Sequence, residues 1–231
     1  MCGRYVRRSD KHRIAEYFRT GETVFDLPPD YNVAPTTFQP VIRLSAETGE
    51  GKIVMMRWGL VPSWHKDPKH LGVSAINAQA ESLMEKPMWR RALQKRRCLV
   101  PADAFYEWQK LDAENKQPFA FGMKSGEPFA FAGLWDRWMA PDGKPLDSFA
   151  IITTDPNEVA ARVHTRMPVI VEPRDYTRWL RMDDEERRPI DLLRPYDAEA
   201  MKAWKVSPDV GNVRNNTPGL CSEWQCPPNS A

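Results

Sequence analysis

The chain has 231 residues, of which 42% are hydrophobic and 28% are charged, so it is too apolar for a disordered protein and long enough for a substantial core. Its net charge of +2 provides no general attraction to nucleic acid, so a DNA-binding surface must be local. No apolar stretch approaches the roughly 18 residues that span a bilayer, and the opening MCGRYVRRSD lacks the apolar run of a signal peptide.

The first half of the chain predicts helices and strands in irregular order. Residues 9–18, SDKHRIAEYF, predict a short helix with Ser9 as its N-cap. Residues 40–44 and 52–60 predict two strands joined by the turn SAETGEG. Residues 87–97 predict a second helix, because proline stands near its start and its apolar residues share one face.

The second half begins with strands and continues with helices. A succession of short strands is predicted at residues 97–102, 104–111, 118–124, 128–135 and 148–154. Residues 155–162, DPNEVAAR, predict a helix with Asp155 as N-cap. After a short strand at residues 168–171, the last third is predicted to be mostly helical, through residues 176–180 and 198–204.

These elements predict an α+β fold. Strands and helices do not alternate regularly, which argues against a doubly wound parallel sheet. We expect a mixed, largely antiparallel sheet that is curled and barrel-like, with helices at its periphery. The whole chain, residues 1–231, forms a single domain in this interpretation, with its core at about residues 2–220 and a short tail at residues 221–231.

The cysteines favour a reduced intracellular protein. The chain has four of them, Cys2, Cys98, Cys221 and Cys226, without a C-x-x-C motif and without histidine at zinc-ligand spacing. We therefore expect a cytosolic or nuclear protein with reduced thiols, no metal, no other cofactor and no membrane partner.

Two basic stretches stand out, at residues 3–13 and 86–97. A solvated helix face is the ordinary explanation of such a stretch, and a local surface for DNA is the alternative. An acidic run at residues 183–186 shows that charges are segregated along the chain.

The second residue has a distinctive chemistry. If Met1 is removed, Cys2 carries a free α-amine and a thiol on adjacent carbons. The amine, with a pKa near 8, can condense with an aldehyde to a Schiff base, and the thiol can close a five-membered thiazolidine ring at high effective concentration. Cys2 therefore suits aldehyde trapping, or acyl transfer as a thiolate, although a second-position cysteine can also have no function.

Other polar residues stand in suggestive settings. SAINAQAES places Asn77, Gln79 and Glu81 on one face if it is extended. AFYEWQ surrounds Glu107 with aromatic residues, where burial would raise the pKa of its carboxyl group. VHTRMPVI places His164 just before a strand. Each of these residues, taken singly, also has an ordinary structural explanation as a paired or packed side chain.

Eight segments together resemble the SRAP family, the SOS-response-associated peptidases that shield abasic sites in DNA. They occur in the family's order from the first residues to about residue 220: MCGRY, YNVAPT, MRWGLVPSW, INAQAES, RRCLVPADAFYEW, IITTD, HTRMPV and RNNTP.

The resemblance implies a role for each candidate residue. Family members bind single-stranded DNA that carries an abasic site, whose ring-opened deoxyribose exposes an aldehyde. Cys2 would form the Schiff base and then the thiazolidine crosslink, and Asn77 would hold the opened sugar. Glu107 would contact the α-amine and assist proton transfer, and His164 would serve acid–base steps, including slow reversal of the crosslink.

The resemblance also suggests which residues contact DNA. Arg4 would lie beside the crosslink, and Trp64 would stack on an exposed base. Gln79 stands where the family usually has arginine, so it offers a phosphate a neutral amide without the positive charge, and Ala104 stands where glycine is common. The complete set of DNA-contact candidates is Arg4, Trp64, Gln79, Arg166 and Arg214, with Arg90 and Arg91 from the second basic stretch.

Three other functions are consistent with some of the same sequence features. Class II glutamine amidotransferases also begin with Met-Cys-Gly, but the chain lacks their RGPD and NGE motifs. A thiol peptidase could use Cys2, Asn77, Glu107 and His164 to remove Met1. A non-covalent reader of single-stranded or modified DNA would need only the basic and aromatic surface. The partner that the resemblance implies is abasic single-stranded DNA, as a plain strand or at a replication fork or junction, bound by a monomer.

Overall fold

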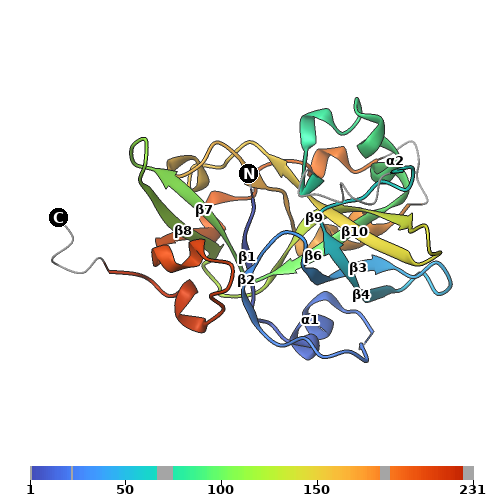
Figure 1. Cartoon of the computed structure of the whole chain (residues 1–231), viewed down its shortest axis with the longest axis horizontal. Coiled ribbons are helices and arrows are strands. Elements are labelled where there is room, and N and C mark those ends of the chain that lie inside the picture. The colour runs from blue at the N-terminus through green and yellow to red at the C-terminus, as the bar shows by residue number, and fades with distance from the viewer. Residues whose placement is uncertain (1, 22, 67–74, 183–187, 226–231) are drawn as a thin grey trace.

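The computed structural model describes residues 2–21, 23–66, 75–182 and 188–225, which form two β-sheets with short helices around them (Figure 1). The strands are β1 (Tyr5–Arg7), β2 (Asp30–Val33), β3 (Phe38–Leu44), β4 (Gly51–Trp58), β5 (Asn77–Gln79), β6 (Arg97–Ala102), β7 (Ala104–Lys110), β8 (Lys116–Met123), β9 (Phe129–Met139), β10 (Pro145–Thr154), β11 (Met167–Pro168), β12 (Ile170–Val171) and β13 (Met201–Lys205). The α-helices are α1 (Lys11–Phe18), α2 (Pro87–Lys95) and α3 (Tyr176–Leu180). Short 3-10 turns are η3 (Ala80–Ser82), η4 (Ala160–Arg162), η5 (Pro173–Asp175), η6 (Ile190–Leu192), η7 (Ala198–Ala200), η8 (Pro208–Gly211) and η9 (Pro218–Cys221).

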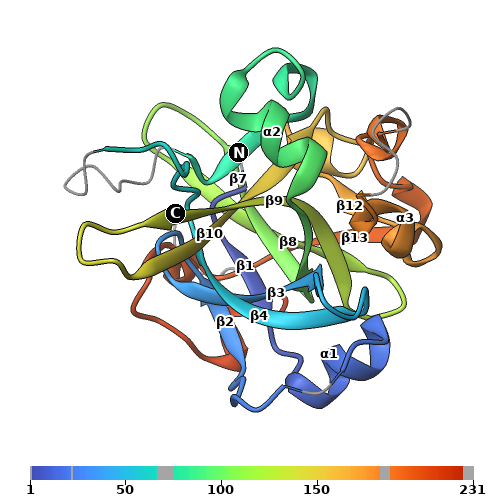
Figure 2. The ribbon, with the colours of Figure 1, turned by 90° about the vertical axis from the view of Figure 1, so that its right-hand side faces the viewer.

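Five strands close into a ring. β4, β3, β6 and β9 are successive antiparallel neighbours, and β10 pairs with both β9 and β4. The pairings of β10 with β4 and β5 are parallel, whereas the other strand pairs are antiparallel. Figure 2 shows these strands curling around one another, with α2 and α1 at opposite ends of the view. The mixed, largely antiparallel and barrel-like sheet that the sequence predicts is therefore confirmed.

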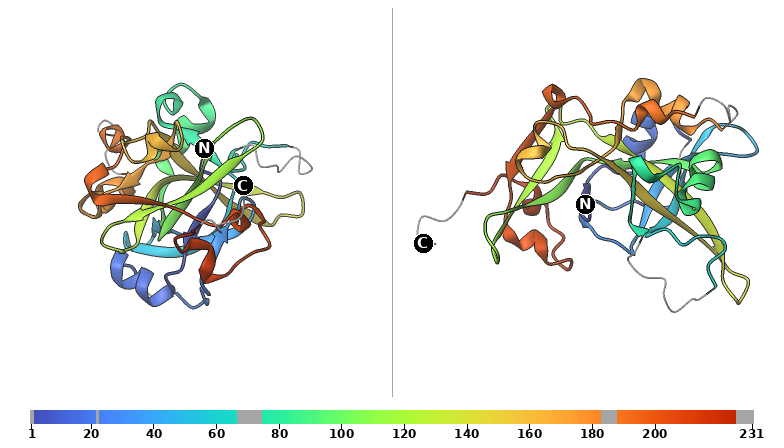
Figure 3. Two further views of the ribbon diagram at one scale, coloured as in Figure 1. Left: turned by 90° about the vertical axis from the view of Figure 1, so that its left-hand side faces the viewer. Right: turned by 90° about the horizontal axis from the view of Figure 1, so that it is seen from above.

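The second sheet positions the N-terminal residues. It is antiparallel throughout, in the order β13–β8–β7–β1–β2. β1 lies between the β7–β8 hairpin and the ring, as Figures 1 and 3 show. Tyr5 fixes this arrangement, because its ring centroid lies 5.3 Å from that of Trp58 in β4 and 5.7 Å from that of Phe131 in β9.

Alternate residues of the ring strands face two different cores. Ile42 and Leu99 pack in one core, together with apolar residues of α1, α2 and α3. Their neighbours Val41 and Val100 pack in the other core, together with β1 and β7. Cys2 belongs to this second core and is fully buried. Because side chains alternate between the two faces of a strand, one face of the ring packs against the helices and the other packs against the first residues of the chain.

The first helix starts differently from the prediction. Ser9 was expected as the N-cap, but Asp10 takes this position and accepts a hydrogen bond from the Arg13 N–H at 2.9 Å. The Ser9 hydroxyl instead donates to Asp103 Oδ1 at 2.7 Å. The Ser9 hydroxyl group therefore binds the buried carboxylate of Asp103 instead of the start of the helix, and Asp10 caps α1.

The prediction of a helix at residues 155–162 is wrong. The segment forms turns and the single 3-10 turn η4. Asn157 Nδ2 donates to the Tyr196 carbonyl oxygen at 2.9 Å, and Asn157 Oδ1 accepts from the Ala160 N–H at 2.9 Å. Asp155, the expected cap, accepts from Arg166 instead. These tertiary contacts hold the segment in a non-helical path.

The last third is also less helical than predicted. α3 is a single short helix, and residues 198–204 form η7 and most of β13 instead of a helix. β13 pairs with β8 from Met201 opposite Met123 to Lys205 opposite Phe119. The acidic run at residues 183–186 lies outside the described residues. None of the helices in the described ranges is both long and apolar enough to cross a membrane.

Candidate functional site

Cys2 lies at the centre of the site. The Arg4 carbonyl oxygen accepts from the Tyr106 N–H at 3.0 Å, which fixes the chain just after Cys2 against β7. The Cys2 thiol donates to the same carbonyl oxygen, with Sγ 3.9 Å away. Burial raises the pKa of the Cys2 thiol, and the nearby Glu107 carboxylate raises it further. The thiol is therefore protonated at neutral pH.

Asn77 holds the backbone of Cys2. β5 lies parallel to β10, with Asn77 opposite Ile151, and this pairing brings the asparagine to the N-terminal residues. Asn77 Nδ2 donates to the Cys2 carbonyl oxygen at 2.9 Å. Asn77 Oδ1 is buried and has no hydrogen-bond partner among the described residues. This oxygen can accept a hydrogen bond from a bound molecule.

Glu107 is the acidic group of the site. It lies in β7 opposite Phe119 of β8 and is only 4% exposed. Burial raises the pKa of Glu107 to about 7, because the apolar surroundings disfavour the charged form. The carboxyl group can therefore both donate and accept a proton near neutral pH.

His164 faces Glu107 from the turn after η4. Its Nε2 lies 3.8 Å from Glu107 Oε2. The Arg166 N–H lies 3.0 Å from His164 Nδ1, and the Arg166 carbonyl oxygen lies 3.2 Å from the same nitrogen. The shorter contact, from the N–H, needs an unprotonated Nδ1 and so favours the neutral tautomer with its proton on Nε2, toward Glu107. Burial lowers the pKa of His164, which favours this neutral form. The structure thus brings Cys2, Asn77, Glu107 and His164 together.

Arg4 is the cation beside these residues. It is half-buried, burial lowers its pKa, and Nη1 donates to Asn32 Oδ1 at 3.4 Å. In the described part of the chain Arg4 forms no ion pair with a carboxylate. A partly desolvated guanidinium with a neutral partner is a favourable site for an anion such as phosphate.

Trp64 is presented to solvent on a well-anchored loop. Its side chain is 65% exposed. The loop is held by the Ser63 N–H, which donates to Asp136 Oδ2 at 2.9 Å, and by Trp138 Nε1, which donates to the His65 carbonyl oxygen at 2.7 Å. Stacking on an exposed base needs an accessible aromatic ring, and a loop that is already ordered presents the ring with little loss of conformational entropy on binding.

The other predicted DNA-contact residues differ in their settings. Gln79, at the end of β5, is exposed, as are Arg214 near the C-terminus and Arg90 and Arg91 on α2. Arg166 is not an exposed cation, because its guanidinium forms ion pairs with Glu81 and Asp155.

Sequence reasoning missed two residues next to the site. Thr153 lies two residues after Ile151 in β10, so it shares a face with Ile151 and with Asn77 opposite. It is fully buried, and its hydroxyl has no hydrogen-bond partner in the described ranges. Asn32 binds Arg4 through Oδ1, and its Nδ2 donates to the carbonyl oxygens of Val210, Asn212 and Asn215. The motifs IITTD and YNVAPT contain both residues, but nothing in the sequence shows that they meet the N-terminal residues.

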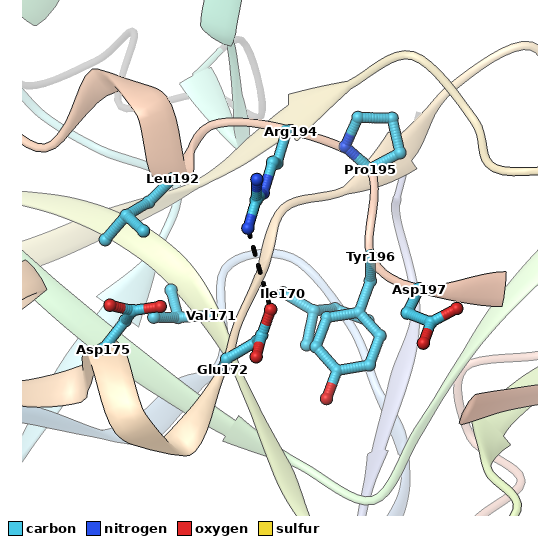
Figure 4. Close-up of a pocket in the computed structure, with 9 residues that line it drawn as sticks. All are labelled: Ile170, Val171, Glu172, Asp175, Leu192, Arg194, Pro195, Tyr196 and Asp197. Atoms are coloured by element: carbon cyan, nitrogen blue, oxygen red, sulfur yellow. Dashed lines mark ion pairs between the residues drawn. The ribbon is translucent and has the colours of Figure 1, made fainter. Parts of the chain in front are cut away.

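A separate cavity of about 280 Å³ lies beside β12 (Figure 4). Glu172, Asp175 and Asp197 line it with carboxylates, and Arg194 Nη2 lies 3.8 Å from Glu172 Oε1. This excess of carboxylates disfavours DNA phosphate. The described residues that line this cavity are all distinct from Cys2 and its neighbours.

Comparisons with known proteins identify the family of the chain. The family model described as SOS response associated peptidase (SRAP) matches residues 1–213. The abasic site processing protein YoqW of Bacillus subtilis (strain 168) is 41% identical over 223 residues, which cover 95% of this chain and 98% of that protein. The abasic site processing protein HMCES of Rattus norvegicus is 35% identical over 226 residues, which cover 82% of this chain and 64% of that protein.

A solved structure has the same fold. The crystal structure of a protein from Bacteroides thetaiotaomicron matches with a TM-score of 0.86 at 25% identity, and the match covers 97% of this chain and all of that one. The family match extends over most of the chain, and the Bacillus relative is similar along nearly its full length. The chain therefore belongs to the SRAP family of SOS response associated peptidases.

Proposed function

We propose that this protein senses and shields abasic sites in single-stranded DNA, and that Cys2, after removal of Met1, forms a covalent crosslink with the ring-opened sugar. The observation that carries the proposal is the convergence of Asn77, Glu107 and His164 on the N-terminal cysteine. Relatives at 35% to 41% identity are named abasic site processing proteins, which supports DNA with abasic sites as the partner.

The proposed chemistry has two stages. The α-amine of Cys2 attacks the C1 aldehyde, and the resulting carbinolamine loses one water molecule to give an imine. The thiol then adds to the imine carbon, while its proton passes to the nitrogen, so that a thiazolidine ring forms. The net reaction joins protein and DNA with the loss of one water molecule, and no oxidant or reductant is consumed.

The protonated thiol favours this order of steps. The pKa of the Cys2 thiol is raised, so a resting thiolate is disfavoured and the amine attacks first. Glu107, with a pKa of about 7, can supply the proton that converts the carbinolamine hydroxyl into water. The resulting carboxylate can then accept the thiol proton as sulfur attacks the imine.

His164 would act on the same protons from the other side. Neutral imidazole with its proton on Nε2 can exchange that proton with Glu107 or with the sugar hydroxyl. The same group would activate water in the reverse reaction, which makes His164 relevant to the lifetime of the crosslink. Asn77 Oδ1 and the Thr153 hydroxyl would receive the hydroxyl groups of the opened sugar.

DNA would approach along the surface that carries Arg4 and Trp64. Arg4 would pair with the phosphate next to the abasic site, and Trp64 would stack on a neighbouring base. Arg214 would extend this surface, because its loop is linked to Arg4 through Asn32.

Covalent capture is tested with single-stranded DNA that carries one abasic site. The mature wild-type protein is expected to give a heat-stable band of higher mass on a denaturing gel, and Cys2→Ala is expected to give none. Cys221→Ser is the matched control, because Cys221 is a half-buried thiol outside the site, and it should crosslink like the wild type. An equal band from Cys2→Ala would refute the proposal.

Borohydride separates the two stages of the reaction. Cys2→Ser retains the α-amine but cannot form the sulfur ring, so its adduct should be lost on heating. Reduction of the imine by borohydride should then recover the adduct. If reduction recovers nothing, the α-amine is not the attacking group.

The family's name suggests a second use of the same residues, the removal of Met1 by the protein itself. The raised pKa of the Cys2 thiol disfavours a resting thiolate, which such a peptidase needs. The mass of the N-terminus of Glu107→Gln, expressed in a host without methionine aminopeptidase activity, decides the question. Self-processing predicts that the wild type loses Met1 there and that the variant retains it.

A further inference from the structure

Phe38 and Trp64 differ from the other aromatic residues of the chain. In the described ranges, every other phenylalanine, tyrosine and tryptophan is buried or half-buried. Phe38 is 54% exposed and Trp64 is 65% exposed. A single exposed apolar residue is ordinary, but two exposed aromatic side chains on one surface indicate a binding site.

Strand pairing places Phe38 and the loop of Trp64 on the same face of the five-stranded ring. Phe38, the first residue of β3, pairs with Arg57 of β4, and Arg57 pairs with Ser148 of β10. Side chains of paired residues point to the same face of a sheet. The Ser148 hydroxyl accepts a hydrogen bond from the Val61 N–H at 2.8 Å, so the loop that carries Trp64 lies against this face.

Arg57 connects the two aromatic residues. It lies between Phe38 and Ser148 in the row of paired residues. Its Nη1 donates to the Gly59 carbonyl oxygen at 3.1 Å, where the chain leaves β4 and enters the Trp64 loop. A positively charged side chain therefore stands between the two exposed aromatic side chains.

The backbone at Phe38 is held in place before any partner binds. The Thr36 N–H donates to the Trp58 carbonyl oxygen at 2.8 Å, and the Trp58 N–H donates to the Thr37 carbonyl oxygen at 2.9 Å. From Phe38 onward the chain pairs with β4 along the whole of β3. Phe38 is therefore presented on ordered backbone, which lowers the entropy lost on binding.

We propose that Phe38 is a second stacking residue, which receives a different unpaired base of the same DNA strand as Trp64. The proposal rests on the proposed function in one respect, that single-stranded DNA is the partner. Two strand spacings, roughly 10 Å, separate Phe38 from Ser148, where the Trp64 loop is held. Each aromatic side chain therefore has space for a base of its own.

The surroundings of Phe38 favour a base over an apolar protein segment. Thr36 and Thr37, which precede it, are exposed and polar, and its neighbour across the strand is Arg57. A protein partner usually needs a continuous apolar patch, which these neighbours interrupt. Aromatic side chains combined with positive charge are the usual means of binding single strands, because every base has an aromatic face and every nucleotide a phosphate.

The decisive variant is Phe38→Leu, which retains an apolar side chain but lacks the aromatic face. It should bind an oligothymidine of about 12 nucleotides, within the usual range of single-strand site sizes, about 10-fold more weakly than the wild type, as the loss of one stacked base implies. Phe38→Trp should bind at least as tightly as the wild type. The dependence of affinity on salt should be unchanged in both variants, because no phosphate contact is removed.

Leu111→Ala is the matched control. It shortens an apolar side chain at a residue that is 62% exposed and lies between β7 and β8, and it should bind like the wild type. Because Phe38 is exposed, Phe38→Leu should also unfold at the wild-type temperature. If Phe38→Leu binds as tightly as the wild type, or if Phe38→Trp binds as weakly as Phe38→Leu, Phe38 does not act by stacking.

A second measurement locates the stacked bases without the crosslink. 2-Aminopurine, whose fluorescence is quenched by stacking, replaces each base in turn in a strand that carries tetrahydrofuran, which has no aldehyde, in place of the abasic sugar. Phe38→Leu should relieve the quenching at one position and Trp64→Leu at another. Quenching that Phe38→Leu leaves unchanged at every position would overturn the proposal. Failure of the wild type to crosslink abasic DNA, together with binding that depends on Phe38, would refute the proposed function and leave the stacking site standing.

Discussion

Glu107 and His164 show how one kind of environment shifts two titrating groups in opposite directions. Burial disfavours whichever form is charged, so it raises the pKa of Glu107 to about 7 and lowers the pKa of His164. Near neutral pH the carboxyl group is partly protonated, and the imidazole is neutral. A pair of this kind can pass protons in either direction, as the proposed condensation and its reversal would both require.

The raised pKa of Glu107 predicts how stability depends on pH. The folded protein holds the Glu107 proton up to about pH 7, whereas the unfolded chain releases it near pH 4.3. The folded state therefore binds more protons between these values, so the stability of the wild type should fall relative to Glu107→Gln as pH rises from about 4.3 to about 7. Urea unfolding of both proteins across this range measures the difference, and a constant difference would contradict the raised pKa.

Gln79 permits a test at the position where the family usually has arginine. It is exposed at the end of β5, next to the site. Gln79→Arg should bind single-stranded DNA more tightly, and the slope of log affinity against log salt should steepen by about 0.7, the value for one phosphate contact on a single strand. An unchanged slope would show that this side chain does not approach a phosphate.

At the scale of elements, the ring requires a close approach between β6 and β9. Gly133 in β9 lies opposite Cys98 in β6. A Cβ atom on Gly133 would lie 2.8 Å from Cys98 Sγ and 3.1 Å from Val100 Cγ2. Glycine at this position therefore lets the two strands pack with both neighbours in place.

Gly133→Ala should consequently destabilise the protein by about 1–3 kcal/mol, the usual cost of overpacking a core. Gly211→Ala is the control, since it has no atom within 4 Å of the added Cβ, and it should unfold like the wild type. The double variant Gly133→Ala with Cys98→Ala should be less destabilised than the sum of the single variants. Additive effects would show that the contact with sulfur is unimportant.

The ring strands and the segments with candidate site residues were predictable from the sequence, and two later elements were not. Strands can be predicted from the local alternation of apolar residues. The motifs around Asn77, Glu107 and His164 can be recognised because each is contiguous in sequence. The segment at residues 155–162 was misassigned because Asn157 is held by Tyr196, a contact that no local pattern contains. The pairing of Arg166 with Glu81, 85 residues apart, depends on the fold in the same way.

At the scale of the whole molecule, buried polar side chains join distant segments. Arg97 is 2% exposed, and its guanidinium donates to carbonyl oxygens of Leu93 at the end of α2 and of Trp179 in α3, each at 2.6 Å. Asp103 accepts from the N–H groups of Arg8 and Ser9 at 2.7 and 2.9 Å. Removal of either partner would leave a buried polar group unpaired, which makes separate unfolding of the segments costly.

This connectivity predicts that the chain unfolds as one unit. Calorimetry should show a single transition, with equal calorimetric and van't Hoff enthalpies. Its enthalpy should be about 160 kcal/mol near 60 °C, at roughly 0.7 kcal/mol for each residue. Two resolved transitions would contradict the single domain expected from the sequence.

The place of β1 has a mechanical consequence for the proposed attachment of DNA to Cys2. β1 is hydrogen-bonded on both sides, to β2 and to β7, and two residues separate Cys2 from its first residue, Tyr5. Tension on a crosslinked DNA strand would therefore be transmitted to β1 along the axis of β1. All the hydrogen bonds of β1 would then be loaded in shear at the same time. A sheet resists shear better than it resists unzipping, so the attachment would remain anchored while enzymes pull on the DNA, and release would need reversal of the crosslink or destruction of the fold.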